Sequence, residues 1–117
     1  QTRSGMMYSQ RDIILIPIPF TDLSSSKKRP VVIVSNDIYN ESFQDVVVVA
    51  ITSNLEPVMF SIPIDNTGLE QGQLKVSSLI RPDKIYTLHK DIIVKKLGKI
   101  SLSTFEKIKK SIGMVID

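Results

Sequence analysis

Five side chains that can bind an oxyanion or transfer a proton stand where apolar runs of the sequence begin or end. They are Arg29, Thr52, Ser53, Arg81 and Asp83. Arg29 precedes Pro30 and the β-branched run 31–34. The proline favours an extended Arg29, and the β-branched run is typical of a strand buried on both faces. We therefore expect Arg29 at the mouth of a buried strand, with its guanidinium directed at an anion.

Basic residues are grouped, although the formal net charge of the chain is only +3. Lys27 and Lys28 adjoin Arg29, so they add positive charge to the expected anion site. A second group of lysines, at positions 95, 96 and 99, is interpreted as a solvated face, which is the usual role of a charge run.

Several kinds of catalytic site are excluded by composition. The chain has no cysteine and a single histidine, His89, which lies in a probable turn and is interpreted as incidental. It contains no glycine-rich phosphate loop, no His-Glu metal motif and no carboxylates spaced for a metal. We therefore expect neither a metal nor a cofactor.

The chain of 117 residues is expected to form one domain over residues 7–117, preceded by an expression remnant or disordered start at 1–6. Its hydrophobic content of 42% and charged content of 23% are ordinary for a globular protein. The apolar runs are too short to cross a bilayer. Lack of cysteine agrees with a reducing compartment, so a cytoplasmic location is expected.

The hydrophobic patterns predict a mainly β fold with a C-terminal helix. Strands are expected over 12–17, from Arg29 through 34, and over 45–52, 59–64, 74–80, 84–88 and 94–100, with a short helical piece at 36–43. The first strand should lie at a sheet edge or bend at Pro17, and 81–83 should interrupt a strand. From Ser101 onward the apolar spacing is helical, with Ser101 or Ser103 as N-cap and a capping box over 103–106. These short strands followed by one helix indicate a small barrel closed by a helix, in which residues 20–28 form a long hairpin loop.

The segments 12–23, 28–35 and 48–53, continued by 80–84 and 96–101, resemble the PemK/Kid/MazF toxins. These are endoribonucleases of type II toxin–antitoxin systems. The resemblance implies an SH3-like (PemK/CcdB-like) barrel with a C-terminal helix, usually a homodimer. It also implies metal-independent cleavage of single-stranded RNA at short sequences, in which the ribose 2′-hydroxyl attacks the phosphorus and leaves a 2′,3′-cyclic phosphate and a 5′-hydroxyl.

The same resemblance implies catalytic roles for Arg29 and Thr52, with Ser53 beside it, and, in the Kid-like branch, for Arg81 and Asp83. A guanidinium has a pKa above about 12 and is a poor base. We therefore assign Arg29 to the phosphate and consider Asp83 the better candidate for the base. The expected RNA contacts are Lys27, Lys28, Phe20, Thr21, Asn54, Phe60 and Tyr86.

The chain also departs from the family pattern. Arg11 stands where the family usually has glycine, and Tyr86-Thr87 replaces an arginine-threonine pair. The loop histidine of Kid-like members is missing, because Ser24, Ser25 and Ser26 occupy that region. The expected partners are single-stranded RNA, a second copy of the chain and an acidic antitoxin, with DNA contacted only through the antitoxin complex; no membrane partner is expected.

Other interpretations remain open at this point. Arg29 could pair with Asp22 or Glu41, the hydroxyls of 52 and 53 could simply end a strand, and Arg81 could form a surface pair with Asp83. Two other functions fit the same fold. One is a non-nuclease toxin of the gyrase-poison type, against which the lack of tryptophan weighs. The other is a barrel that binds RNA or a peptide without catalysis.

Overall fold

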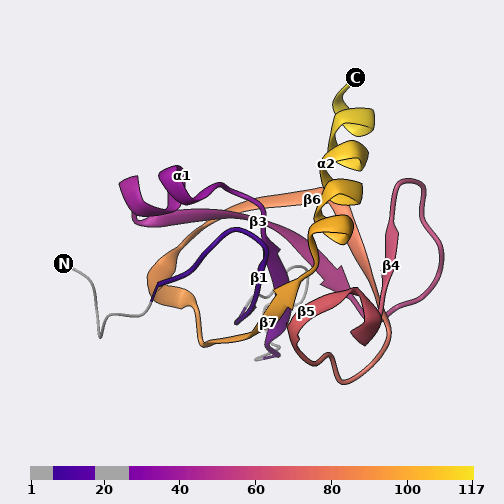
Figure 1. The fold of residues 1–117 in the computed structure, drawn as a ribbon, viewed down its shortest axis with the longest axis horizontal. Helices are drawn as coiled ribbons and strands as arrows, with labels where there is room; N and C mark the ends of the chain where they lie inside the picture. The colour runs from indigo at the N-terminus through magenta and orange to yellow at the C-terminus, as the bar shows by residue number, and fades with distance from the viewer. Residues whose placement is uncertain (1–6, 18–26) are drawn as a thin grey trace.

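The chain folds into an antiparallel sheet that curls around a core and is followed by a C-terminal helix (Figure 1). The computed structural model describes residues 7–17 and 27–117. In this part of the chain, seven strands pair in the order β4-β6-β3-β2-β1-β7-β5. The strands are β1 (Asp12–Ile16), β2 (Arg29–Ile33), β3 (Asp45–Thr52), β4 (Ile62–Ile64), β5 (Leu69–Gly72), β6 (Ser78–His89) and β7 (Lys95–Ile100). The helices are α1 (Asp37–Ser42) and α2 (Leu102–Ile116), with 3-10 turns at Asn66–Gly68 and Lys90–Ile92.

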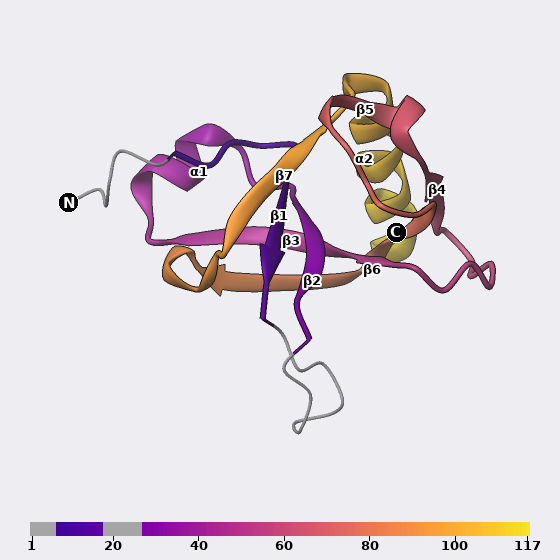
Figure 2. The same cartoon turned by 90° about the horizontal axis from the view of Figure 1, so that it is seen from below.

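The two edge strands of the sheet, β4 and β5, lie near each other beside α2 (Figure 2). One 3-10 turn joins them, so the sheet must curl to bring its two edges together. This arrangement confirms the predicted mainly β fold with a C-terminal helix. Neither helix within 7–17 and 27–117 combines the length and apolar character needed to span a membrane.

Both faces of the central strands are buried. One set of side chains, the helix-side cluster, includes Ile13, Val32 and Val49, and α2 adds Phe105 and Ile108 to it. The residues next in sequence face the other way and form an opposite cluster of Ile14, Ile16, Val31, Ile33, Val46 and Val48. Burying each such side chain contributes about 1.5–3 kcal/mol. This two-sided burial confirms the interpretation of the β-branched run after Pro30 and gives Arg29 a rigid base.

The expected interruption at 81–83 is wrong, because β6 runs through it. Val49 pairs with Ile85, whereas the next residue, Ala50, pairs with Arg81. Residues 82–84 therefore form a bulge opposite β3. Pro82 has no N–H to donate, and a bulge is a place where a proline does not disturb the ladder.

Two other strand predictions are too long. The expected strand 59–64 is confined to Ile62–Ile64, because Met59 and Phe60 form a turn in which Phe60 has a φ of 69°. The expected strand 74–80 begins only at Ser78, and β5 over Leu69–Gly72 was not predicted.

The first strand is internal, so the edge position, one of the two alternatives predicted for it, is wrong. β1 pairs with both β2 and β7, and it ends at Ile16, one residue before Pro17. Because the proline lies outside the ladder, its missing donor does not affect strand pairing. The antiparallel pairing of Ile16 with Arg29 confirms the predicted hairpin, while residues 1–6 and 18–26 lie outside the described residues.

The helix caps differ in part from those predicted. Ser101 caps α2 by accepting a hydrogen bond from the Thr104 N–H at 3.2 Å. Ser103 already lies within the first turn of α2, so the capping box expected at 103–106 is wrong. The short helix α1 confirms the helical piece expected at 36–43, and Asn36 is its N-cap.

Candidate active site

Arg29 is the first residue of β2, at the end of the strand that precedes its buried part. It pairs with Ile16 of β1, and the next residues of β2 are fully buried from Val31 onward. Within residues 7–17 and 27–117 the Arg29 guanidinium forms no ion pair, so the pairing with Glu41 is not present. Asp22, the other partner considered for Arg29, lies outside the described residues. Among the described residues, no carboxylate is paired with the Arg29 guanidinium.

The register brings three of the predicted catalytic residues to one face of the sheet. Val31 pairs with Ala50, and Ala50 pairs with Arg81. Paired residues of antiparallel strands share a face, as do residues two positions apart. Arg29 lies two residues before Val31, and Thr52 lies two residues after Ala50. Arg29, Thr52 and Arg81 therefore share the face of the opposite cluster.

A cavity of about 530 Å³ opens at the end of β2, and Arg29 contributes to its wall. Five lining side chains are basic: Lys27, Lys28, Arg29, Lys75 and Lys95. None of the described residues that line it is acidic. The other lining residues are the polar Ser53, Gln73 and Ser78 and the apolar Leu15, Pro30, Ile51, Leu74, Val76 and Leu97. A low-dielectric wall that carries one sign of charge attracts anions strongly.

The two neighbouring hydroxyl residues at the end of β3 are separated by the pleat. Ser53 lines the cavity together with Ile51, whereas Thr52 does not line it. The Thr52 hydroxyl oxygen accepts a hydrogen bond from the Asn54 N–H at 3.1 Å, which is the strand-ending turn considered as an alternative. That bond uses an oxygen lone pair, so the Thr52 O–H is still available as a donor.

Arg81 and Asp83 form a two-pronged ion pair across the bulge of β6. Arg81 Nε donates to Asp83 Oδ1 at 2.9 Å, and Nη2 donates to Oδ2 at 2.7 Å. The hydrogen bonds from Arg81 lower the pKa of Asp83 below its usual value, and Asp83 in turn raises the pKa of Arg81. Asp83 is therefore ionised at neutral pH, but its affinity for a proton is reduced.

The sequence of the chain matches one protein family over residues 9–116. The family is described as the PemK-like, MazF-like toxin of type II toxin–antitoxin systems. The chain belongs to this family. Among curated proteins, no sequence matches the chain.

Solved structures similar to this MazF-like chain cover nearly all of it. An endoribonuclease from a mycobacterial species has a TM-score of 0.76 at 19% identity, covering 97% of this chain and 95% of that one. MazF from Deinococcus radiodurans has a TM-score of 0.76 at 14% identity, covering 96% and 98%. A mycobacterial endoribonuclease in complex with its cognate antitoxin has a TM-score of 0.72 at 20% identity, covering 93% and 94%. At these identities the likeness shows the fold.

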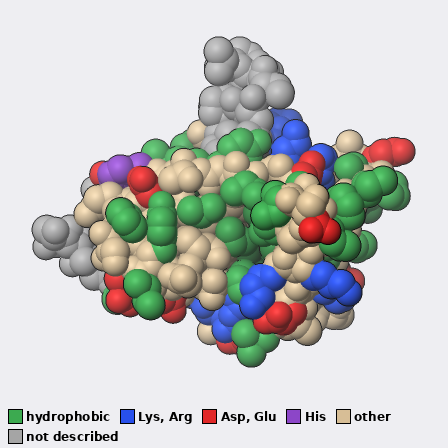
Figure 3. Space-filling view, turned by 90° about the horizontal axis from the view of Figure 1, so that it is seen from above, with side chains coloured by type: hydrophobic (Ala, Val, Ile, Leu, Met, Phe, Trp, Pro, Cys, Tyr) green, Lys and Arg blue, Asp and Glu red, His purple; other side chains and the backbone are tan. Residues whose placement is uncertain are grey.

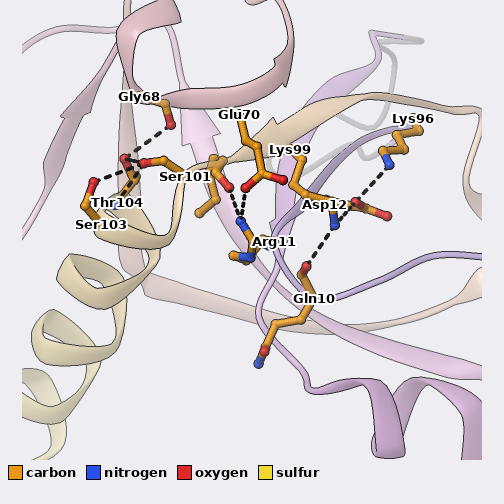
Figure 4. A network of polar contacts seen from close by, with 11 residues as sticks. Gln10, Arg11, Asp12, Gly68, Glu70, Lys96, Lys99, Ser101, Ser103 and Thr104 are labelled. Atoms are coloured by element: carbon orange, nitrogen blue, oxygen red, sulfur yellow. Dashed lines mark hydrogen bonds and ion pairs between the residues drawn. The ribbon is translucent and has the colours of Figure 1, made fainter.

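The structure explains how this MazF-like chain accommodates Arg11 where the sequence comparison with the family expects glycine. Arg11 has a φ of 81°, a left-handed conformation that glycine adopts freely and other residues adopt at a cost. Its Nη1 donates to Glu70 Oε1 at 2.8 Å and to the Ile100 carbonyl at 2.9 Å (Figure 4). These bonds tie the start of β1 to β5 and β7 and offset the strain. They also help hold the strands that frame the cavity.

A buried carboxylate next to Arg11 accounts for two of the lysines interpreted as solvated. The Asp12 side chain is 1% exposed and lies 3.2 Å from Lys96 Nζ and 2.9 Å from Lys99 Nζ (Figure 4). The third lysine of that group, Lys95, lines the cavity. Lys95 and Lys96 are exposed, as that interpretation expects, whereas Lys99 is only partly exposed. The ion pairs with Asp12 and the cavity position of Lys95 are roles that the interpretation did not include.

The RNA contacts predicted outside the catalytic set are scattered. Lys27 and Lys28 line the cavity, whereas Asn54, Phe60 and Tyr86 do not. Tyr86 packs against the opposite cluster, and Phe60 occupies the turn before β4. Phe20 and Thr21 lie outside the described residues.

Sequence reasoning missed one wall of the cavity. Gln73, Leu74, Lys75 and Val76 form it, and they had been placed partly in a strand. The alternation of polar and apolar residues over 73–77 favours a strand, and nothing local indicates which strands such a segment faces.

Proposed function

We propose that this MazF-like protein is an endoribonuclease that cleaves single-stranded RNA, with Arg29 binding the scissile phosphate. The observation that carries the proposal is the cavity at the end of β2, where five basic side chains and the Ser53 hydroxyl surround one hollow. The family membership supports it, as do similar structures that are described as endoribonucleases. A phosphodiester of RNA is the anion that agrees both with the positive charge of the cavity and with the family to which the chain belongs.

In the proposed reaction the ribose 2′-hydroxyl attacks the adjacent phosphorus and the 5′-oxygen of the next nucleotide leaves. The products are a 2′,3′-cyclic phosphate and a 5′-hydroxyl. Negative charge accumulates on the non-bridging oxygens in the transition state, and a guanidinium can donate two parallel hydrogen bonds to them. Arg29 takes this role. The 2′-hydroxyl gives up its proton to solvent water, and the leaving 5′-oxygen takes a proton from the Arg29 guanidinium, which then recovers one from water.

The hydroxyls of Thr52 and Ser53 are proposed to donate to the same phosphate from two sides. Thr52 shares the sheet face of Arg29, and Ser53 lines the cavity with it. We propose that the phosphate binds at the mouth of β2, between that sheet face and the cavity, where both hydroxyls can donate to it. Each donor positioned in this way typically contributes about 10²–10³ in rate.

Arg81 is proposed to bind the phosphate, and Asp83 to position Arg81. The ion pair occupies Nε and Nη2 of the guanidinium and leaves Nη1 available for a second acceptor. The lowered pKa of Asp83 weakens it as the base suggested by the sequence. This arrangement favours positioning over proton transfer.

The reaction is proposed to proceed without a metal ion. The charge that a divalent cation would supply to the phosphorane can come from Arg29 and the lysines of the cavity. Arg81 does not line the cavity and would act from the sheet face that it shares with Arg29. No group of three or more metal-ligating side chains occurs among the described residues. No cofactor enters the proposed reaction.

An acidic antitoxin, a second copy of the chain and RNA are the proposed partners, acting in the cytoplasm. A basic cavity offers the charge that an acidic peptide would neutralise. Apolar side chains are exposed on the face seen in Figure 3. Among the exposed apolar residues of the protein are Met114 and Ile116 of α2 and Met59 of the loop after β3. A surface of this kind supports association with another protein. DNA is proposed to be contacted only through the antitoxin complex.

The test is incubation of the purified protein with a long single-stranded RNA in EDTA. The wild type should cut at defined sequences and leave cyclic phosphate and 5′-hydroxyl ends. Arg29→Ala should lose this cleavage, whereas Lys110→Ala, which removes an exposed lysine of α2, should cut normally. Intact RNA with the wild type would overturn the proposal and leave a binding barrel or a toxin of another kind.

A further inference from the structure

We infer that the cavity is a subsite for one RNA base beside the phosphate held by Arg29, and that Gln73 is the residue that selects this base. The inference rests on the proposed ribonuclease function and extends it to sequence selection. Nothing in the sequence pattern pointed to Gln73. The assignment follows from the side chains that line the cavity.

The walls of the cavity match the two kinds of surface that a base presents. Apolar side chains such as Ile51, Leu74 and Leu97 supply surface for the flat faces of a base. The volume of about 530 Å³ lies within the range of about 300–1,000 Å³ typical of small-molecule sites. The lysines at the rim supply charge for the phosphates that flank the base. A simple anion would not need the apolar walls.

Gln73 is the one amide among the described lining residues, and an amide is suited to reading a base edge. It presents a donor and an acceptor side by side, as does the edge of a nucleobase. Adenine, with N6 and N7, is the base to which glutamine binds through two hydrogen bonds in this way. The other polar lining residues, Ser53 and Ser78, carry single hydroxyls, which discriminate less between bases.

Both neighbours of Gln73 are fixed, so its side chain is presented from a rigid position. Gly72 has a φ of 80°, and a Cβ at this position would lie 2.1 Å from the Leu97 carbonyl oxygen. On the other side, the Leu74 N–H donates to Asn66 Oδ1 at 2.7 Å, and the Leu74 side chain packs against the helix-side cluster. Selective hydrogen bonding requires this kind of support.

The candidates for base recognition that sequence reasoning offered within the described residues lie elsewhere. Asn54, Phe60 and Tyr86 do not line the cavity. Gln73 reaches it from the loop between β5 and β6, whereas Arg29 reaches it from β2 and Ser53 from the end of β3. The two functions, holding the phosphate and selecting the base, are therefore carried by separate parts of the chain.

The experiment maps cut sites in a pool of RNA with random sequence, for the wild type, Gln73→Ala and Gln71→Ala. Gln71 is the matched control, because it is an exposed glutamine two residues earlier that does not line the cavity. Gln73→Ala should reduce discrimination at one nucleotide position by about tenfold or more, which corresponds to about 1.4 kcal/mol. Gln71→Ala should keep the wild-type preference. Unchanged preference in Gln73→Ala would overturn the inference.

A binding measurement separates failure of this inference from failure of the proposed function. Short 2′-O-methyl oligonucleotides cannot be cut by 2′-hydroxyl attack, so fluorescence anisotropy reports base preference alone. A preference that Gln73→Ala abolishes supports the subsite even if the wild type cuts no RNA, and absence of preference in the wild type overturns it. Gln73→Glu, which keeps the shape of the side chain and loses the amide donor, should change the preferred base and serves as the second variant if Gln73→Ala does not fold.

Discussion

Replacing Asp83 with Asn tests whether this carboxylate positions Arg81 or accepts a proton. The substitution keeps the shape of the side chain and removes its charge. The pair consists of two hydrogen bonds of 2.9 and 2.7 Å between side chains that are 21% and 32% exposed. Exposed ion pairs contribute about 0.2–1 kcal/mol, and this two-pronged, largely shielded geometry places the pair near 1 kcal/mol. We expect the free energy of unfolding to fall by that amount, which lowers the Tm by about 4 °C.

The effect on cleavage separates the two roles. A general base typically contributes about 10²–10⁴ in rate, whereas a residue that only orients a neighbour contributes through that neighbour. We expect Asp83→Asn to slow cleavage by about tenfold and to have no further effect in the Arg81→Ala background. The assay is single-turnover cleavage by the wild type, both single variants and the double variant. A loss above about 100-fold for Asp83→Asn, repeated in the Arg81→Ala background, would refute the positioning role.

Three further substitutions or conditions probe the site and its frame. Arg29→Lys keeps the charge but loses the planar fork, so cleavage in EDTA should slow by at least about tenfold with an unchanged Tm; a rate equal to the wild type would contradict the two-pronged phosphate contact. Because the folded-state pKa of Asp83 is lowered, its contribution to stability is present above the unfolded pKa of about 3.9 and is lost as the pH falls through the lower, folded value. Urea titrations should therefore show a constant difference between the wild type and Asp83→Asn from pH 7 to 5 that shrinks below about pH 4, and a difference already absent at pH 5 would contradict the pKa shift. Gly72→Ala should destabilise the fold by more than about 2 kcal/mol, because position 72 has a positive φ and a Cβ there would meet the Leu97 oxygen. Gly113→Ala is the control, since it lies in open space on α2 and should be neutral or stabilising. Equal Tm values for the two variants would contradict the close approach of β5 and β7.

The parts of the fold that the sequence predicted are those specified by local patterns. The β-branched runs of β2 and β3 and the helical spacing of α2 each identify their element without knowledge of the rest. Arg29 was predictable at the mouth of a strand for the same reason, because Pro30 and the buried run that follows fix its place. Whether Arg29 acts as proposed stays a prediction.

The parts that were missed depend on contacts between distant segments. The bulge that admits Pro82 into β6 exists because β3 pairs on both sides of it. The position of β1 inside the sheet follows from pairing with β7, whose paired residues lie 80 or more positions later in the sequence. The same pairing sends Lys95 to the cavity while Lys96 reaches Asp12, although the two lysines are adjacent in sequence.

The cavity wall at Gln73 illustrates the same limit within the site. The sequence predicts a strand directly after Gln73, and only the curling of the sheet brings Gln73 to the cavity that Arg29 also lines. Thr52 and Ser53 show a finer case, since adjacent hydroxyls that looked equivalent in sequence fall on different sides of the strand. The sequence therefore indicates which residues are chemically suited to the site, but it does not indicate on which side of the sheet each side chain lies.

The most direct test is a crystal structure of the protein with an oligoribonucleotide that carries 2′-deoxyribose at the scissile position. A phosphate oxygen should lie within about 3 Å of the Arg29 guanidinium, with the adjoining base in the cavity against Gln73. RNA bound on another face, with Arg29 and the cavity unoccupied by nucleotide, would contradict the account.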